Sequence, residues 1–411
     1  MLNLTRRTAI VASAAAALPR LGRAQAAGPE VKGVKLGYIA LTDAAPLIVA
    51  QERGLFAKHG MPDVDVAKQA SWGGVRDNLV LGGERGGIDG AHILTPLAYL
   101  IHTGKVVQNG AGVAMAIVAR LNTNGQAISV AAALPGATLD SKALKAKFAA
   151  KADNKVAVTF RGGTHDLWMR YWLAAGGIDP EREVQTIVVP PPQMVANMKV
   201  GTMDAFCVGE PWNDQLVHQK MGYTACVTGE IWRDHPEKSL AFRADWVAKN
   251  PRAAQALTAA VIEAQIWADE TANKAELAAL LGKRAWFNVP PADILPRSLG
   301  DIDYGDGRAV TASPLRMKFW ADHASYPFQS HELWFLTENQ RWGVLPGDMD
   351  TGALVKAVNR EDIWRAAAAA AGAPPGPAST SRGVEEFFDG VRFDPADPAA
   401  YLAKLTIRKV A

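Results

Sequence analysis

Residues 155–175, KVAVTFRGGTHDLWMRYWLAA, contain the pattern that decides the fold. The apolar run from Lys155 to Thr159 predicts a buried strand, and apolar residues at helical spacing predict a helix from Asp166 to Ala175. A Gly-Gly-Thr turn joins the two segments. A strand, a short turn and a helix in this order form the repeating unit of an open α/β sheet.

The same pattern recurs on both sides of this stretch. Further strands are predicted at residues 34–39, 64–67, 88–91, 185–189 and 205–208, and further helices at residues 46–59, 71–81, 193–200 and 251–274. Ser71 has the residue type and position of an N-cap. Two such blocks, joined near Asn122 to Gln126, predict an α/β protein of two lobes with a ligand cleft between them, because open α/β sheets bind ligands outside the carboxyl ends of their strands. Residues 372–379, rich in Pro, Gly and Ala, predict a surface linker.

The first 26 residues predict export from the cytoplasm. Paired arginines, Arg6 and Arg7, precede an apolar run from Ala9 to Leu18 that is too short for a stable membrane span. Ala24-Gln25-Ala26 fits the A-x-A cleavage pattern. Because the arginines are paired, we expect residues 1–26 to be a twin-arginine signal peptide and the protein to work in the periplasm.

Composition and charge exclude several classes of function. The 411 residues are 49% hydrophobic and 21% charged and carry a net charge of +3. Four arginines and no acidic residue lie in residues 1–26, so the remaining chain has a charge of about −1 and no basic patch for nucleic acid. No metalloprotease, nucleophile-elbow or dinucleotide-binding motif is present, so we expect no enzymatic activity, no cofactor and no metal. The two cysteines, Cys207 and Cys226, are expected to be free rather than paired.

Residues 162–166, Gly-Gly-Thr-His-Asp, are candidates for holding a small anion. They lie between a predicted strand and a predicted helix, whose first turn offers free N–H groups and a positive dipole end. Gly163 would allow a ligand to approach the backbone closely. Thr164 suits either a helix cap or a ligand donor, and His165 suits either a structural role or a ring donor to the ligand. The Gly-Lys-Ser/Thr of a phosphate-binding P-loop is absent.

Three further positions carry possible donors. Trp72 follows a predicted strand and either packs in the core or places its ring and indole N–H over a ligand. Gln126 lies at the predicted connection between the lobes and offers an amide donor to ligand or backbone. Lys238, judged on position alone, is expected on the surface. An anion site needs such donors and positive potential, and we expect no acceptors to point into it.

Six stretches of the chain together resemble the nitrate/bicarbonate-binding proteins of ABC importers. They are QASWGGVRDNLVLG (69–82), GGIDGAHILTPLAYLI (86–101), ARLNTNGQAISVA (119–131), FRGGTHDLWMRYWLAAGGIDP (160–180), PPPQMVANMKVGTMDAFCVGEPWN (190–213) and TGEIWRDHPEKSLAFRADWV (228–247). The resemblance covers nearly all of residues 34–250 and is looser beyond them. It implies a two-lobed periplasmic-binding-protein fold of the type with two crossovers. We therefore expect residues 27–124 and 241–411 to form lobe 1 with a C-terminal extension, and residues 125–240 to form lobe 2.

The resemblance also implies which residues hold the anion, namely Trp72, Gln126, His165 and Lys238. The position of Lys238 separates the ligands, because the bicarbonate-binding relatives have an acidic residue there and use calcium. Nitrate is planar, carries one negative charge and only accepts hydrogen bonds, so a cationic donor favours it. Many relatives carry a lipoprotein cysteine at the cleavage site, which this sequence lacks.

Nitrate, or nitrite, is thus the expected ligand, delivered to an ABC permease by a monomer that binds no nucleic acid. Bicarbonate or cyanate binding within the same family remains open. So does a different class of protein, a nitrate/nitrite sensor that signals through a protein partner. A sensor would stay in the cytoplasm, so the destination of the chain separates the two classes.

Overall fold

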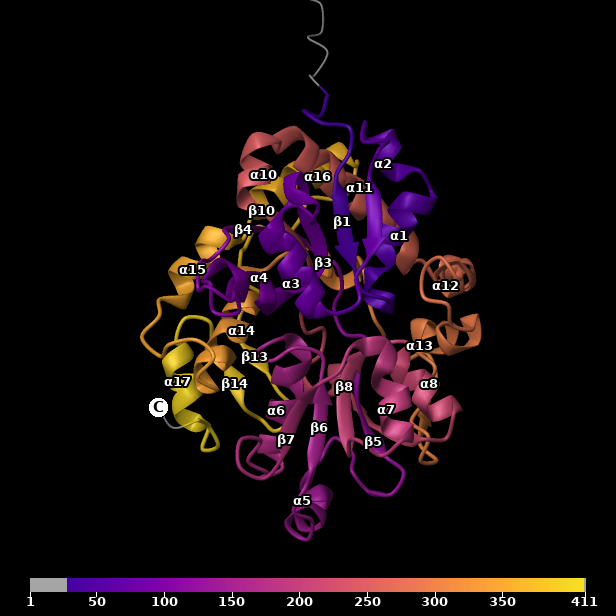
Figure 1. The fold of residues 1–411 in the computed structure, drawn as a ribbon, viewed down its shortest axis with the longest axis vertical. Helices are drawn as coiled ribbons and strands as arrows, with labels where there is room; N and C mark the ends of the chain where they lie inside the picture. The colour runs from indigo at the N-terminus through magenta and orange to yellow at the C-terminus, as the bar shows by residue number, and fades with distance from the viewer. Residues whose placement is uncertain (1–27, 410–411) are drawn as a thin grey trace, which may run out of the picture.

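The computed structural model describes residues 28–409 and contains two five-stranded sheets, each within its own lobe (Figure 1). The predicted signal peptide, residues 1–26, lies outside the described residues. The sheet of lobe 1 consists, in order across the sheet, of β2 (Asp65–Lys68), β1 (Lys35–Tyr38), β3 (Gly90–Leu94), β10 (Lys238–Arg243) and β4 (Met115–Arg120). The sheet of lobe 2 consists of β7 (Gln185–Val188), β6 (Lys155–Val158), β8 (Ala205–Gly209), β5 (Gln126–Ala131) and β9 (Gly222–Val227).

The two sheets share one topology. In each, three parallel strands adjoin a fourth strand of opposite direction, which is β10 in lobe 1 and β5 in lobe 2. The chain passes from lobe 1 to lobe 2 between β4 and β5 and returns between β9 and β10. Because β5 and β10 run against their neighbours, they begin at the edge where the parallel strands end. Residues that open these two strands therefore meet the loops that follow β1, β2, β3, β6 and β8.

The helices of lobe 1 follow the predicted pattern with two differences: the helix predicted over residues 46–59 is divided, and the helix predicted over residues 251–274 ends at Asp269. They are α1 (Ala45–Glu52), α2 (Leu55–Lys58), α3 (Trp72–Leu81), α4 (Thr95–His102), α10 (Ala244–Lys249), α11 (Pro251–Asp269), α12 (Lys274–Gly282), α15 (Thr351–Val358) and α16 (Glu361–Ala370). Ser71 caps α3 as predicted, because its side chain accepts from the Gly74 amide. The helix predicted over residues 46–59 is two helices. Gly54 has a φ of 67°, a left-handed conformation that a continuous helix does not contain.

Lobe 2 contains shorter helices around its sheet. They are α5 (Lys142–Ala149), α6 (Thr164–Ala175), α7 (Met194–Lys199), α8 (Trp212–His218) and α9 (Thr228–Ile231). The helix predicted from Asp166 begins two residues earlier, at Thr164, and Gly163 occupies the N-cap position. Thr164 is therefore the first helical residue rather than the cap. Its hydroxyl is free to point away from the backbone.

The chain after α12 links the two lobes. It contains α13 (Leu295–Leu299), β11 (Ile302–Asp303), β12 (Ala309–Val310), α14 (Gln329–Arg341), β13 (Glu385–Glu386), β14 (Arg392–Phe393) and α17 (Pro398–Lys404). Helix α14 packs against α4 of lobe 1 and α6 of lobe 2. The final segment, drawn in yellow beside α6 in Figure 1, buries Phe387, Phe393 and Tyr401 in the apolar core of lobe 2.

This packing changes the expected division of the chain. Residues 241–411 are expected to form lobe 1 with a C-terminal extension, and the final segment of that extension packs its aromatic side chains with Trp168 and Tyr171 of lobe 2. Strand β10 also joins the sheet of lobe 1 from Lys238 onward, three residues before the expected boundary. We therefore propose that residues 384–409 belong to lobe 2 and that lobe 1 resumes at Lys238.

The two cysteines do not approach each other. Cys207 on β8 and Cys226 on β9 both lie opposite Ile128 of the intervening strand β5, and both thiols are buried and free, as expected. Among residues 28–409, no helix has the length and the apolar character needed to cross a membrane.

Candidate functional site

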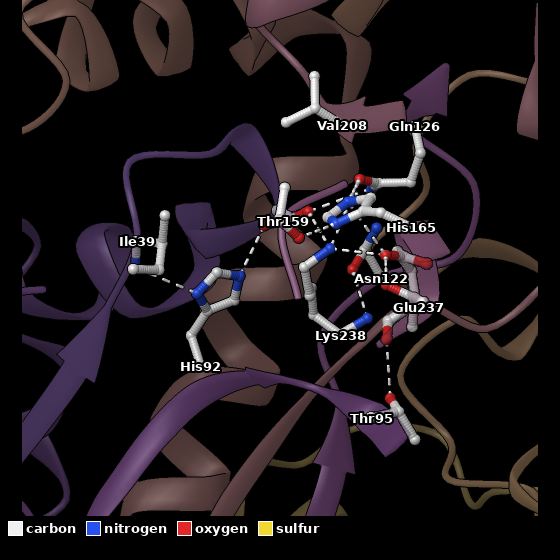
Figure 2. Close-up of polar contacts among 12 residues, drawn as sticks. Ile39, His92, Thr95, Asn122, Gln126, Thr159, His165, Val208, Glu237 and Lys238 are labelled. Atoms are coloured by element: carbon white, nitrogen blue, oxygen red, sulfur yellow. Dashed lines mark hydrogen bonds and ion pairs between the residues drawn. The ribbon is translucent and has the colours of Figure 1, made fainter. Parts of the chain in front are cut away.

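The Lys238 ammonium lies at the centre of a polar cluster between the two lobes (Figure 2). Lys238 is fully buried, with Nζ 2.7 Å from Glu237 Oε1 and 2.9 Å from Asp43 Oδ2. Burial by itself would lower the pKa of Lys238, but the two carboxylates outweigh burial and raise it. Lys238 therefore carries a full positive charge. Its expected surface position was wrong, because the first residue of β10 faces the interface between the lobes.

Gln126 and His165 bring lobe 2 to this cluster. His165 Nε2 is 2.7 Å from Gln126 Oε1, and His165 Nδ1 is 2.5 Å from the Thr159 hydroxyl. Burial, together with the charge of Lys238, lowers the pKa of His165 well below its usual value, so the ring is neutral. Since Gln126 Oε1 only accepts, His165 donates from Nε2 and accepts from Thr159 at Nδ1. Gln126 in turn donates from Nε2 to Asp43 Oδ2 over 3.1 Å.

Thr164 and Gly163, at the start of α6, have different hydrogen-bond partners. The Thr164 hydroxyl donates to Glu237 Oε1, so Thr164 reaches Lys238 through that carboxylate. Trp168, one turn further along α6, donates to Glu237 Oε2 over 3.0 Å. The Gly163 amide donates to the Phe160 carbonyl over 3.1 Å, within its own loop. A contact of Gly163 with ligand stays a prediction.

Trp72 lies on the side of lobe 1, at the start of α3. Its indole is fully buried, with the ring centroid 5.9 Å from Lys238 Nζ and 5.2 Å from the His92 ring. Trp72 Nε1 has no hydrogen-bond partner among the residues that the structure describes. A buried indole N–H without a partner is costly in a folded protein and is a ready donor.

Four of the other five predicted site residues, Trp72, Gln126, Thr164 and His165, thus lie around the Lys238 ammonium, either in contact with it or one residue away, and Gly163 lies beside them at the interface. Sequence reasoning missed three neighbours, Asp43, His92 and Glu237. Asp43 lies in η1 (Thr42–Ala44), in the loop that follows β1, and its position beyond the carboxyl end of a parallel strand was a usable signal. Glu237 precedes Lys238 in the chain. His92 lies within β3 and carried no signal of its own.

One expectation about the site was wrong. The cluster was expected to hold donors only, but the carboxylates of Asp43 and Glu237 both point at the Lys238 ammonium. The physical reason is burial, since an ammonium without access to water needs compensating charge and acceptors. Burial would raise the pKa of Asp43, but Lys238 and His92 outweigh it and hold that pKa well below its usual value. Burial raises the pKa of Glu237, and Lys238, Thr164 and Trp168 only partly offset this.

The geometry suits the capture of a small molecule that accepts hydrogen bonds. Donors converge from both lobes, and each of their side chains is at most 1% exposed. A pocket beside Gln126 is lined by Thr42, Glu210, Arg297 and Arg316 among others, but Lys238 does not line it. The ammonium is therefore closed off from solvent in this arrangement.

The chain is similar to known binding proteins over most of its length. The model of the NMT1-like family matches residues 27–282. The nitrate/nitrite binding protein NrtA of Synechococcus elongatus is 58% identical over 389 residues, which cover 93% of this chain and 88% of that protein. The bicarbonate-binding protein CmpA of the same organism is 42% identical over 92% of this chain and 88% of its own length.

A solved structure matches over nearly the whole chain. The crystal structure of the periplasmic nitrate-binding protein NrtA from Synechocystis PCC 6803 superposes with a TM-score of 0.91 at 56% identity. The match covers 93% of this chain and 100% of that one. It confirms the predicted α/β architecture, a two-lobed periplasmic-binding-protein fold.

Proposed function

This chain belongs to the NMT1-like family, and from that premise we propose that it is the solute-binding component of an ABC importer that captures nitrate or nitrite. The expected resemblance to nitrate-binding proteins is confirmed, since identity to NrtA exceeds identity to CmpA, 58% against 42%. These relatives are named as binding proteins and not as enzymes. A membrane permease would receive the anion from this protein.

The buried ammonium of Lys238 is the observation that carries the proposal. It lies where the lobes meet, within reach of the Gln126 and Trp72 side chains. Nitrate has three acceptor oxygens, one negative charge and no proton to donate, so it needs a cation and several N–H donors. Bicarbonate needs, in addition, an acceptor for its hydroxyl. Because the Asp43 and Glu237 carboxylates beside Lys238 could accept from that hydroxyl, the preference for nitrate over bicarbonate rests on the higher identity to NrtA than to CmpA, 58% against 42%.

Closure of the two lobes would trap the anion. Contacts that cross the interface include the Thr42 amide with the Glu210 carbonyl, 2.7 Å, and the Trp212 indole with the Ala40 carbonyl, 3.0 Å. Arg297 holds the Glu210 carboxylate at 2.7 Å and so supports this part of the interface. Opening would break these contacts and expose Lys238, with the two crossovers as hinge segments.

The proposal includes a compartment. Arg6, Arg7 and the cleavage pattern at Ala24 to Ala26 support export by the twin-arginine route to the periplasm. There the protein would act as a monomer, meeting the inner membrane through the permease. A reporter fused after Ala27 tests this, because a reporter that stays cytoplasmic would favour the sensor function instead.

Calorimetry on the chain from Ala27 onward tests the ligand. We expect nitrate to bind with a micromolar or tighter Kd, and Lys238→Met to weaken binding at least 100-fold, since it removes the cation that meets the anion. Nitrite, cyanate and bicarbonate, the last with and without calcium, complete the series. If bicarbonate gives heat and nitrate gives none, the proposed ligand is wrong.

A second buried lysine provides the matched control. Lys274 is 1% exposed, and its Nζ donates to the Ala268 carbonyl over 2.8 Å and lies 3.7 Å from Asp269, outside the cleft. Lys274→Met should lower the melting temperature and leave the nitrate Kd unchanged. An equal loss of affinity in both variants would mean that burial of a lysine, rather than its place in the cleft, matters.

A further inference from the structure

The carboxylate of Asp43 accepts hydrogen bonds from the groups that the proposed function assigns to the anion. Asp43 Oδ2 is 2.9 Å from Lys238 Nζ and 3.1 Å from Gln126 Nε2. Its other oxygen, Oδ1, is 2.6 Å from His92 Nε2. One oxygen of Asp43 thus faces the anion donors, and the other is held by a residue of β3.

A carboxylate and a nitrate ion present similar chemistry to these donors. Both are planar, carry one negative charge and offer only acceptor oxygens. Lys238 also donates to Glu237 Oε1 over 2.7 Å and to Gln126 Oε1 over 3.5 Å, so with Asp43 Oδ2 its three protons already have acceptors in the protein. A nitrate oxygen that binds Lys238 and Gln126 must therefore compete with Asp43 Oδ2 for the same N–H groups.

His92 allows Asp43 to release Lys238 and Gln126 while keeping one hydrogen-bond partner. Its Nδ1 accepts from the Ile39 amide over 3.4 Å, which leaves Nε2 to donate to Asp43, and its ring packs against Trp72. When Oδ2 gives up Lys238 and Gln126, Oδ1 still has its partner in His92. Asp43 then keeps a buried negative charge next to the bound anion.

We propose that Asp43 determines the charge selectivity of the site as a built-in competing carboxylate. Three groups contact the Asp43 carboxylate: Lys238 from β10, His92 from β3 and Gln126 from β5. Glu237 contacts Lys238 on its other side, and the neutral His165 contacts Gln126. Lys238 between Asp43 and Glu237 leaves one net negative charge. A dianion such as sulfate meets twice the net repulsion that a monoanion meets. The net charge of the site therefore penalises sulfate more than nitrate.

Asp43→Asn tests this proposal, which rests on the proposed function. The asparagine oxygen can still accept from His92, while its amide removes the competing charge and adds a donor towards the anion. We expect the nitrate Kd to fall about tenfold or more and sulfate binding to become measurable by calorimetry. If nitrate binds more weakly to a folded Asp43→Asn protein, or sulfate still gives no heat, the proposal is overturned.

Asp293→Asn provides the matched control. Asp293 Oδ1 is 2.8 Å from His218 Nδ1, so this substitution also removes an aspartate from an aspartate–histidine pair, but one that Lys238 does not contact. We expect its nitrate and sulfate affinities to equal those of the wild type. A gain of sulfate binding in Asp293→Asn as well would assign the selectivity to overall charge and overturn the role of Asp43.

A crystal structure of the wild-type mature protein with nitrate keeps the proposal testable if Asp43→Asn does not fold. We expect a nitrate oxygen to replace Asp43 Oδ2 at both Lys238 Nζ and Gln126 Nε2, with the Asp43–His92 contact retained. If Asp43 keeps both contacts in the complex, the proposal is overturned and the proposed function stands. If the wild type binds no nitrate in calorimetry, the proposed function itself fails.

Discussion

Leu94, at the end of β3, occupies the space in which a side chain of Gly163, at the start of α6, would lie. A Cβ atom on Gly163 would be 2.7 Å from Leu94 Cδ1 and 3.1 Å from the Phe160 carbonyl oxygen. The backbone of Gly163, with a φ of −80°, would accept other residues, so the contact between the lobes is what requires glycine here. Substitutions of these two residues therefore test whether the lobes close as they do in this structure.

Gly163→Ala should weaken nitrate binding by about 10- to 100-fold, because overpacking by one methyl group costs about 1–3 kcal/mol and acts on the closed form. Calorimetry measures the affinity, and Leu94→Ala in the same chain should recover part of it. Gly347→Ala is the control, since a Cβ there has no atom within 4 Å. Equal affinities for Gly163→Ala and the wild type would show that Leu94 and Gly163 do not meet in the bound state.

Trp72→Phe should lower nitrate affinity about tenfold while changing stability little, because Trp72 Nε1 bonds no other described residue and its removal breaks no existing hydrogen bond. Calorimetry and thermal melting separate the two effects. Trp172→Phe is the opposite case, since the Trp172 indole donates to the Thr138 carbonyl over 3.0 Å within lobe 2. It should lose stability and keep its affinity. A Trp72→Phe variant with wild-type affinity would remove Trp72 from the site.

Phe387→Ala should lower the free energy of unfolding by about 3–5 kcal/mol, because it empties a buried position in the core of lobe 2. The Phe387 ring lies 4.9 Å from the Tyr171 ring and 5.5 Å from the Trp334 ring. Urea unfolding gives the value. Val384→Ala, on a side chain that is 47% exposed, should change it little. Similar small losses in both variants would mean that the final segment does not dock on lobe 2 in solution.

Glu332→Gln should remove part of the pH dependence of the unfolding free energy between pH 4.5 and pH 7. Burial, only partly offset by Arg120 and by the Tyr99 hydroxyl, raises the pKa of Glu332 to about 7. Because this lies above the value of 4.5 in an unfolded chain, the folded state holds the extra proton. The stabilisation is complete below about pH 4.5 and is lost as the pH rises through 7.

The difference in unfolding free energy, variant minus wild type, should therefore rise by about 3 kcal/mol between pH 4.5 and pH 7. Urea unfolding at pH steps across this range measures it. If this difference does not change with pH, Glu332 titrates at the same pH in the folded and the unfolded chain. A falling difference would show that Arg120 holds it ionised.

Much of the fold was predictable because strands and helices have different apolar periods. β1, β2, β6 and β8 lie within one or two residues of their predictions, and Ser71 caps α3 as its residue type indicated. The split between α1 and α2 was missed because Gly54 and Gly60 both suit a helix end, and spacing alone does not rank them.

The docking of residues 384–409 had no local signal either. Phe387 and Tyr401 are ordinary aromatic residues in the sequence, and their partners Tyr171 and Trp334 are distant in the chain. Pairing across such separations depends on how the lobes are placed, which periodicity does not specify. The same reason explains why Lys238 was expected on the surface.

By itself, the sequence determined most of the elements and their grouping into two α/β blocks, because these follow from residue type and spacing along the chain. That Trp72, Gln126 and His165 donate to the ligand was implied only by the family resemblance and stays a prediction. Only the tertiary structure decided the charge of the site. Lys238, Glu237 and Asp43 come from two separate parts of the sequence, and only the folded chain places both carboxylates within 3 Å of one ammonium. The balance of charge in a buried cluster depends on the distances between its charged groups, and these distances are set only when the strands pair in the folded protein.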